Sequence, residues 1–176
     1  MGWNAQPTSM VYFEDVHVPV SNLIGSEGEG FKIAMAGLDG GRINIAACSL
    51  GAAQSAFDKA IDHMHDRHAF GKQLTELQAL QFKIADMETD LQAARIFLYQ
   101  AAWMLTKNLP DATKHCAMVK RLVTDIGFNV ANEALQLHGG YGYLKEYGIE
   151  KIVRDLRAHQ ILEGTNEISL LYTSPS

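Results

Sequence analysis

The chain has 176 residues, a formal net charge of −5 and 47% hydrophobic side chains, and 20% of its residues are charged. This composition is typical of a globular domain with a core of its own, and it excludes a disordered chain. The mild acidity and the lack of a basic stripe exclude a dedicated nucleic-acid binder. No apolar run approaches the roughly 20 residues that a membrane span needs.

The N-terminal segment has the pattern of β-structure. Residues 9–18 are rich in β-branched and aromatic side chains and lead into Pro19. This predicts one strand, or two short ones, followed by a loop through Gly25 and Gly30. Because a lone strand cannot form a sheet, its partners are expected from chain outside this sequence.

From about Phe31 onwards the apolar residues recur at steps of three and four, which is the period of a helix face. Three such series predict long helices over about residues 31–64, 77–105 and 119–137. Pro110–Asp111 separates the second helix from the third.

A bundle of three long helices needs a fourth element to cover its apolar seams. Gly139–Gly140 ends the third helix, and residues 148–161, with a short helix after Thr165, supply the fourth. The sequence therefore predicts a mainly α fold, an antiparallel four-helix bundle with a short β segment at its N-terminus.

The segment from Ile161 to Glu167 holds the strongest candidate for chemistry. It places one carboxylate, Glu163, directly before Gly164 and a helix-start signal in which Thr165 is the cap. A base fixed at such a junction suits proton abstraction, because a general base must lie within hydrogen-bond reach of its target. An ordinary helix cap is the alternative interpretation.

Three further motifs place polar groups beside glycine. Gln136–Tyr143 is a glycine-rich turn that lets backbone approach a ligand, or else a plain helix end. In Arg67–Gly71 an arginine and an aromatic ring suit a phosphate and a stacked base, or else a charged helix end. In Asp39–Arg42 two glycines interrupt the helical pattern early, and either a ligand or a packing kink offsets their cost of about 1 kcal/mol each.

A metal site is not expected. His63, His65 and His68 do not have the spacing of a helical zinc site. A di-iron bundle needs a Glu-x-x-His pair on each of two helices, and the only such spacing, Glu14 to His17, lies in the predicted strand.

Taken together and in this order, the motifs resemble the C-terminal half of the acyl-CoA dehydrogenase family over nearly the whole chain, from Gly2 to about Leu170. The segments that carry the resemblance are Asp39-Gly40-Gly41-Arg42, Arg67-x-x-Phe70-Gly71, Gln78, Leu135 to Gly142, Arg154-Asp155 and Glu163-Gly164-Thr165. The stretches 37–46 and 137–145 are most similar to the members that oxidise isobutyryl-CoA.

The resemblance implies a flavoprotein that oxidises an acyl-CoA to its α,β-enoyl-CoA, with Glu163 as the catalytic base. One subgroup carries the base on the first helix instead, but the matching position here is Gly41, which has no carboxylate. Other positions match acyl-CoA contacts: Asp39, Gly40, Gly41, Arg42 and Gly164. Positions that match FAD contacts, in part those of a neighbouring subunit, are Arg67, Phe70, Gln78, Gln136, Leu137, His138, Gly139, Gly140, Thr165, Asn166 and Glu167.

The same resemblance implies a domain division and partners. Residues 1–28 match the remnant of a middle β-domain, residues 29–172 the helical domain, and residues 173–176 are a tail. The expected partners are an acyl-CoA, an electron-transfer flavoprotein and further copies of the chain in a tetramer. The expected compartment is the cytoplasm of a bacterium or the mitochondrial matrix of a eukaryote, and no targeting signal is seen.

Two other functions stay open at this level. The chain is alternatively a helical interaction module without catalysis, or part of an acyl-CoA oxidase that lets oxygen reach the flavin. Since an N-terminal helical domain and most of the middle domain are not in this sequence, the isolated chain is expected to fold as a bundle, to bind FAD weakly and to be inactive.

Overall fold

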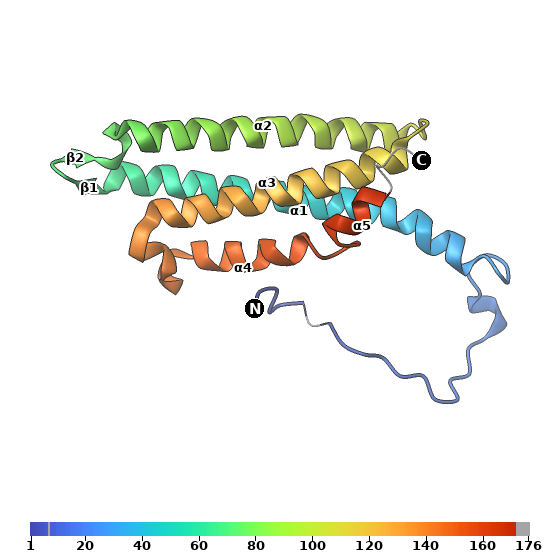
Figure 1. The fold of residues 1–176 in the computed structure, drawn as a ribbon. Coiled ribbons are helices and arrows are strands. Elements are labelled where there is room, and N and C mark those ends of the chain that lie inside the picture. Colours follow the sequence, from blue (N-terminus) through green and yellow to red (C-terminus); the bar gives the residue numbers. More distant parts are fainter. Residues whose placement is uncertain (7, 172–176) are drawn as a thin grey trace.

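The apolar series fold as three long helices, α1 (Gly30–Asp66), α2 (Gln78–Thr106) and α3 (Ala112–His138), followed by the shorter α4 (Ile149–His159) and α5 (Asn166–Leu171). The computed structural model describes residues 1–6 and 8–171. Figure 1 shows the elongated bundle that they form. Short 3₁₀ turns lie at Val20–Asn22 (η1), Leu74–Glu76 (η2), Gly139–Tyr143 (η3) and Lys145–Tyr147 (η4).

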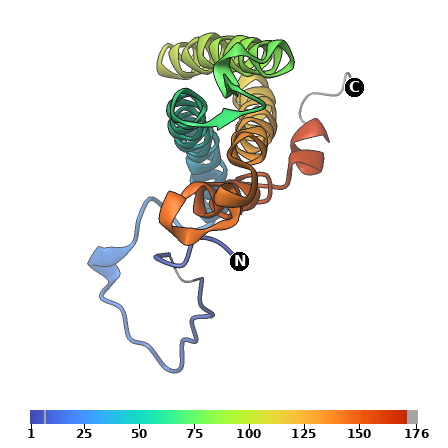
Figure 2. The same ribbon diagram turned by 90° about the vertical axis from the view of Figure 1, so that its left-hand side faces the viewer.

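Helices α1 and α3 lie side by side at the centre, with α2 against one side of this pair and α4 against the other (Figures 1 and 2). Small residues allow the central pair to approach closely. A Cβ atom added to Gly127 of α3 would lie 3.2 Å from the carbonyl oxygen of Ser49 on α1. The fully buried residues of α1 in this core are also small: Ala46, Ala53, Ala56 and Ala60.

The connections follow the turn residues of the sequence. Between α1 and α2, His68–Ala69 (β1) pairs antiparallel with Lys72–Gln73 (β2), and the two turn residues, Phe70 and Gly71, have positive φ, as a two-residue hairpin requires. The other two long connections also use left-handed residues, Asp111 before α3 and Gly139 after it.

The predicted antiparallel bundle and its helix positions are confirmed. The predicted position of the β segment is wrong for this structure. Residues 9–18 form no strand within the described chain, and the strand pair lies instead between α1 and α2. The physical reason is that a strand needs a neighbour for its backbone N–H and C=O groups.

The first residues of the chain pack against α4. The backbone N–H of Trp3 donates to Asp155 at 2.6 Å, and its indole N–H donates to Nε2 of His159 at 3.2 Å. Since Nε2 accepts, Nδ1 of His159 carries the proton and donates to Oγ of Ser49 at 2.6 Å. This chain of contacts joins the N-terminus, α4 and α1.

Candidate functional site

Glu163 lies in a tight turn between α4 and α5. Its φ is +57° and that of Gly164 is +89°, and a left-handed backbone is strained for a residue other than glycine. The turn is closed by a hydrogen bond from the backbone N–H of Asn166 to the carbonyl of Gln160 at 3.0 Å. We call residues 160–166 the base turn.

The carboxylate of Glu163 rests against Gly41 in the middle of α1. A Cβ atom added to Gly41 would lie 2.7 Å from the Cδ atom of Glu163 and would overlap one of its oxygens. The sequence offered two explanations for a glycine at position 41, a nearby ligand or a kink in the helix. The structure gives a third explanation. Helix α1 continues through this position, and glycine makes room for the carboxylate.

Asp39 and Arg42 form a buried pair beside this glycine. Arg42 donates to Oδ1 of Asp39 at 3.1 Å, and Thr113 of α3 donates to Oδ2 at 2.6 Å. The Arg42 side chain is 5% exposed, and the hydrogen bond from Thr113 joins the pair to the start of α3. At Gly40 the surrounding space is open, and nothing in the structure explains the glycine.

A buried lysine supports the base turn from α3. Lys120 is fully buried, and its ammonium donates to the carbonyl of Gly164 and to Oδ1 of Asn166, both at 2.7 Å. Burial lowers the pKa of Lys120 to about 8, which leaves the cation as the main form at neutral pH. The sequence analysis did not select this residue. The sequence did contain a sign of its burial, because Lys120 falls on the same helix face as Cys116, Val123 and Gly127, which are buried in α3.

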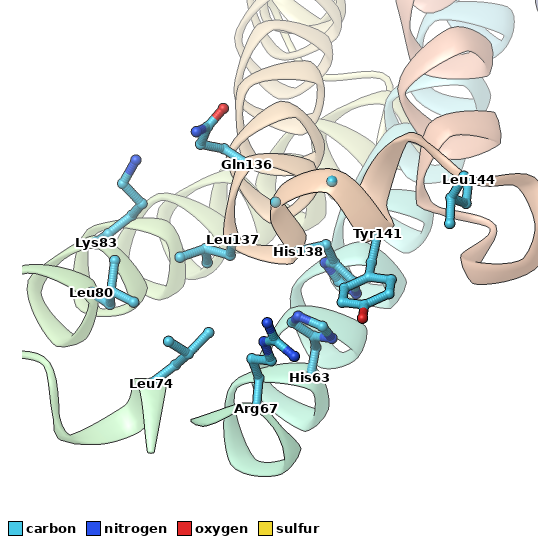
Figure 3. Close-up of a pocket in the computed structure, with 12 residues that line it drawn as sticks. His63, Arg67, Leu74, Leu80, Lys83, Gln136, Leu137, His138, Tyr141 and Leu144 are labelled. Carbon is cyan, nitrogen blue, oxygen red and sulfur yellow. The ribbon is translucent and has the colours of Figure 1, made fainter. Parts of the chain in front are cut away.

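A second group of predicted residues surrounds an open cavity of about 590 Å³ at the opposite end of the bundle, which we call the cradle. Arg67 enters it from the end of α1 and Gln136–Gly140 from the end of α3, as Figure 3 shows for the labelled side chains. Lys83 lines the same cavity from α2. A glycine-lined wall beside Arg67 is suited to phosphate oxygens, whereas Lys83 is already ion-paired with Glu133.

Aromatic rings line one side of the cradle. His63 stacks on His138 with ring centroids 4.5 Å apart, and the Arg67 guanidinium lies 5.5 Å from the Tyr141 ring centre. Burial, and then the neighbouring His138, lower the pKa of His63. His63 and Lys83 were not predicted as cofactor contacts, and Tyr141 was noted only as part of the glycine-rich turn, because only the fold brings the ends of three helices together.

The predicted residues therefore fall into two groups. Lys120, at the base turn, and Gln136, at the cradle, are separated by about 24 Å of α3 at 1.5 Å per residue. Two predicted cofactor contacts lie outside the residues that line the cradle: Phe70 is 96% exposed in the hairpin, and Gln78 is exposed at the start of α2.

Two searches of the described residues bear on other classes of site. Among residues 1–6 and 8–171, no group of three His, Cys, Asp or Glu side chains is arranged to hold a metal ion. In the same part of the chain, each helix is too short or too polar to cross a membrane.

Comparison with known proteins gives the family. The profile described as acyl-CoA dehydrogenase, C-terminal domain, matches residues 28–173. The mitochondrial isobutyryl-CoA dehydrogenase of Bos taurus is 52% identical over 100% of this chain and 42% of its own length. The chain belongs to the acyl-CoA dehydrogenase family and corresponds to its C-terminal domain, and it spans under half the length of the relatives it matches.

Solved structures agree with this assignment. Butyryl-CoA dehydrogenase from Megasphaera elsdenii superposes with a TM-score of 0.88 at 45% identity, over 92% of this chain and 42% of that one. A chain from a structure of the electron transferring flavoprotein of Acidaminococcus fermentans gives a TM-score of 0.88 at 44% identity, with the same coverage.

Proposed function

We propose that this chain is the base-carrying part of an FAD-dependent enzyme that converts a short, branched acyl-CoA to its enoyl-CoA. The observation that carries the proposal is the carboxylate of Glu163, held in a strained turn and lodged over Gly41 of α1. Strained backbone at a fixed carboxylate is typical of a preorganised site. An ordinary helix cap does not require Glu163 to adopt a left-handed conformation.

In this mechanism Glu163 accepts the α-proton of the acyl thioester. That proton is weakly acidic, so the enolate oxygen that develops needs hydrogen-bond donors. The backbone N–H of Glu163 is the donor that we assign from this chain. Gly41 keeps the space beside the carboxylate free of a side chain, and the pair of Asp39 and Arg42 fixes the adjacent wall.

The cradle fits the phosphate and adenine part of FAD, because it combines Arg67, exposed glycine backbone and aromatic rings around one cavity. When bound, FAD supplies the acceptor for the hydride that leaves the β-carbon. Thr165 and Glu167 are proposed flavin contacts at the other end of the bundle. Asn166, the third predicted contact, is instead buried, and its side chain is hydrogen-bonded to Lys120, Thr124 and Asp125.

Because the base turn and the cradle lie at opposite ends, we propose that one flavin uses the base turn of one subunit and the cradle of another. Homo-oligomer formation, with a tetramer as the expected state, then completes the site. Phe70 and Gln78 lie exposed near the cradle end, where a second subunit would make their predicted cofactor contacts possible.

The substrate class and the electron acceptor rest on the relatives. The 52% identity to an isobutyryl-CoA dehydrogenase supports a short branched acyl group, and the similarity to a chain solved with an electron transferring flavoprotein supports such a protein as acceptor. The exposed apolar side chains of the N-terminal segment, including Tyr12 and Phe13, support the proposal that residues 1–28 pair with a further β-domain.

Substitution of the base tests the proposal in the longest form of the protein that carries this sequence. Glu163→Gln is expected to lower turnover of isobutyryl-CoA by about 10²- to 10⁴-fold, the usual contribution of a general base, with FAD content unchanged. Turnover equal to that of the unmodified protein would rule out Glu163 as the base, and a non-catalytic interaction module predicts no turnover in either form. Peroxide formation in place of dye reduction would identify an oxidase.

A further inference from the structure

We propose that Lys120 is the positioning residue of the base: its ammonium holds the base turn in the conformation that directs the Glu163 carboxylate onto Gly41. The inference rests on the proposed function for its catalytic consequence. Its structural part, the control of the turn by a lysine on another helix, stands on contacts within this chain.

The first observation is the pair of oxygens that Lys120 binds. Both lie at 2.7 Å, one being the carbonyl of Gly164, directly after the base, and the other the side-chain oxygen of Asn166. These acceptors are neutral and both belong to the turn. A lysine placed for charge neutralisation would be expected to bind a carboxylate first, so this geometry indicates that Lys120 shapes the backbone.

The second observation is the network that fixes the far side of the turn. The side-chain amide of Asn166 donates to Oγ1 of Thr124 at 3.0 Å and to Oδ1 of Asp125 at 2.8 Å. The same Asp125 oxygen accepts from the side chain of Gln160 at 2.8 Å. Residues 160 and 166, the two ends of the base turn, are therefore tied to one stretch of α3, and Lys120 holds the segment between them.

The third observation is the backbone conformation of Glu163 and Gly164, which is unfavourable for a free glutamate. Glu163 and Gly164 both have positive φ, and a glutamate released from this turn would favour negative φ. That rotation would carry its carboxylate away from Gly41. The complete burial of Lys120 makes the two hydrogen bonds obligatory, since a buried ammonium without acceptors is strongly unfavourable.

The substitution that isolates this role is Lys120→Met, which keeps an unbranched side chain only one atom shorter and removes its donors. In the apoprotein, amide hydrogen exchange of residues 161–167 is expected to accelerate at least about tenfold. In the longest form of the protein, kcat for isobutyryl-CoA should fall about 10- to 100-fold while KM changes less than about threefold, because the base is displaced rather than the substrate lost.

The matched control is Leu91→Ala, a fully buried change on α2, across the bundle from the base turn. It should lower stability without faster exchange confined to residues 161–167 and without loss of kcat at a temperature where it is folded. Lys120→Arg, which keeps the charge and donors, should recover part of the exchange protection and of kcat. If Lys120→Met does not fold, Lys120→Gln, with a neutral donor one bond shorter, takes its place in both measurements.

Unchanged exchange in residues 161–167 would overturn the proposal, as would a kcat loss no larger than that of Leu91→Ala. The outcome is distinguishable from failure of the proposed function. If Glu163→Gln retains full turnover, the base assignment fails, whereas the exchange measurement on the apoprotein still reports on whether Lys120 holds the turn.

Discussion

The two ends of the bundle are built differently. At the base turn, Glu163 is positioned by contacts within the chain, and the supporting Lys120 and Asn166 are buried and hydrogen-bonded. At the cradle, Arg67 and the glycines of η3 face an open cavity of about 590 Å³. The difference indicates that the group proposed for proton transfer is preorganised by folding, while the proposed nucleotide site is left open by the fold of this chain.

The largest expected effect comes from adding one methyl group at Gly41, which tests whether Glu163 is preorganised. Gly41→Ala should lower turnover about a hundredfold, because its Cβ occupies the position of the Glu163 carboxylate and a small displacement of a catalytic group is costly. Helix propensity favours alanine by about 1 kcal/mol, so thermal stability should fall far less than turnover. The matched control is Gly51→Ala on the same helix, where the space is open; equal turnover in both variants would contradict the preorganised base.

Removal of the cradle arginine should act on the ligand and not on the fold. Arg67→Gln is expected to weaken FAD binding about 10- to 100-fold, the value of one charged hydrogen bond of about 1.5–3 kcal/mol. Its side chain is exposed, so unfolding of the apoprotein should shift by less than about 0.5 kcal/mol. Flavin fluorescence titration measures the first and urea unfolding the second. Lys107→Gln, which removes an exposed charge outside the cradle, is the control, and identical affinities in the two variants would exclude the cradle as the cofactor site.

The smallest expected effect is a dependence of folding stability on pH through His159, at the end of α4 next to the base turn. Burial lowers the pKa of His159 from 6.5, although Asp155 opposes this shift and Lys120 reinforces it. On acidification the unfolded chain therefore binds the proton first, and stability is lost as the pH falls below about 6.5, by at most about 1.4 kcal/mol per pH unit. Urea unfolding at about pH 7.5 and about pH 5.5 should show a steeper loss for the natural chain than for His159→Gln. Parallel losses would show that His159 does not contribute.

Periodicity predicted the helices because each of them buries a continuous apolar face. The positions that separated or ended the predicted helices hold in the structure: Pro110 lies in the connection between α2 and α3, and Gly139 directly follows α3. The β segment at residues 9–18 was not predictable in the same way. A strand is defined by its neighbour, and a content of β-branched and aromatic residues alone cannot say whether a neighbour is present.

The candidate site was also predictable only in part, in those residues that local sequence identifies. Glu163 was identified from its local sequence and from the family resemblance, and the glycine motif at 40–41 from its cost within a helix. Lys120 was missed, because a lysine in a helical pattern is usually a solvated residue. Its contact with Gly164 joins residues 44 positions apart in the chain.

The amino-acid sequence by itself determined the helical periods, their ends and the residue types available for acid–base chemistry, since these depend on near neighbours along the chain. Only the tertiary structure decided that the carboxylate of Glu163 lies on Gly41 and that Lys120 supports it. It also decided that the cradle lies at the opposite end of α3. Each of these depends on the packing of helices against one another, which brings together side chains that no local pattern relates.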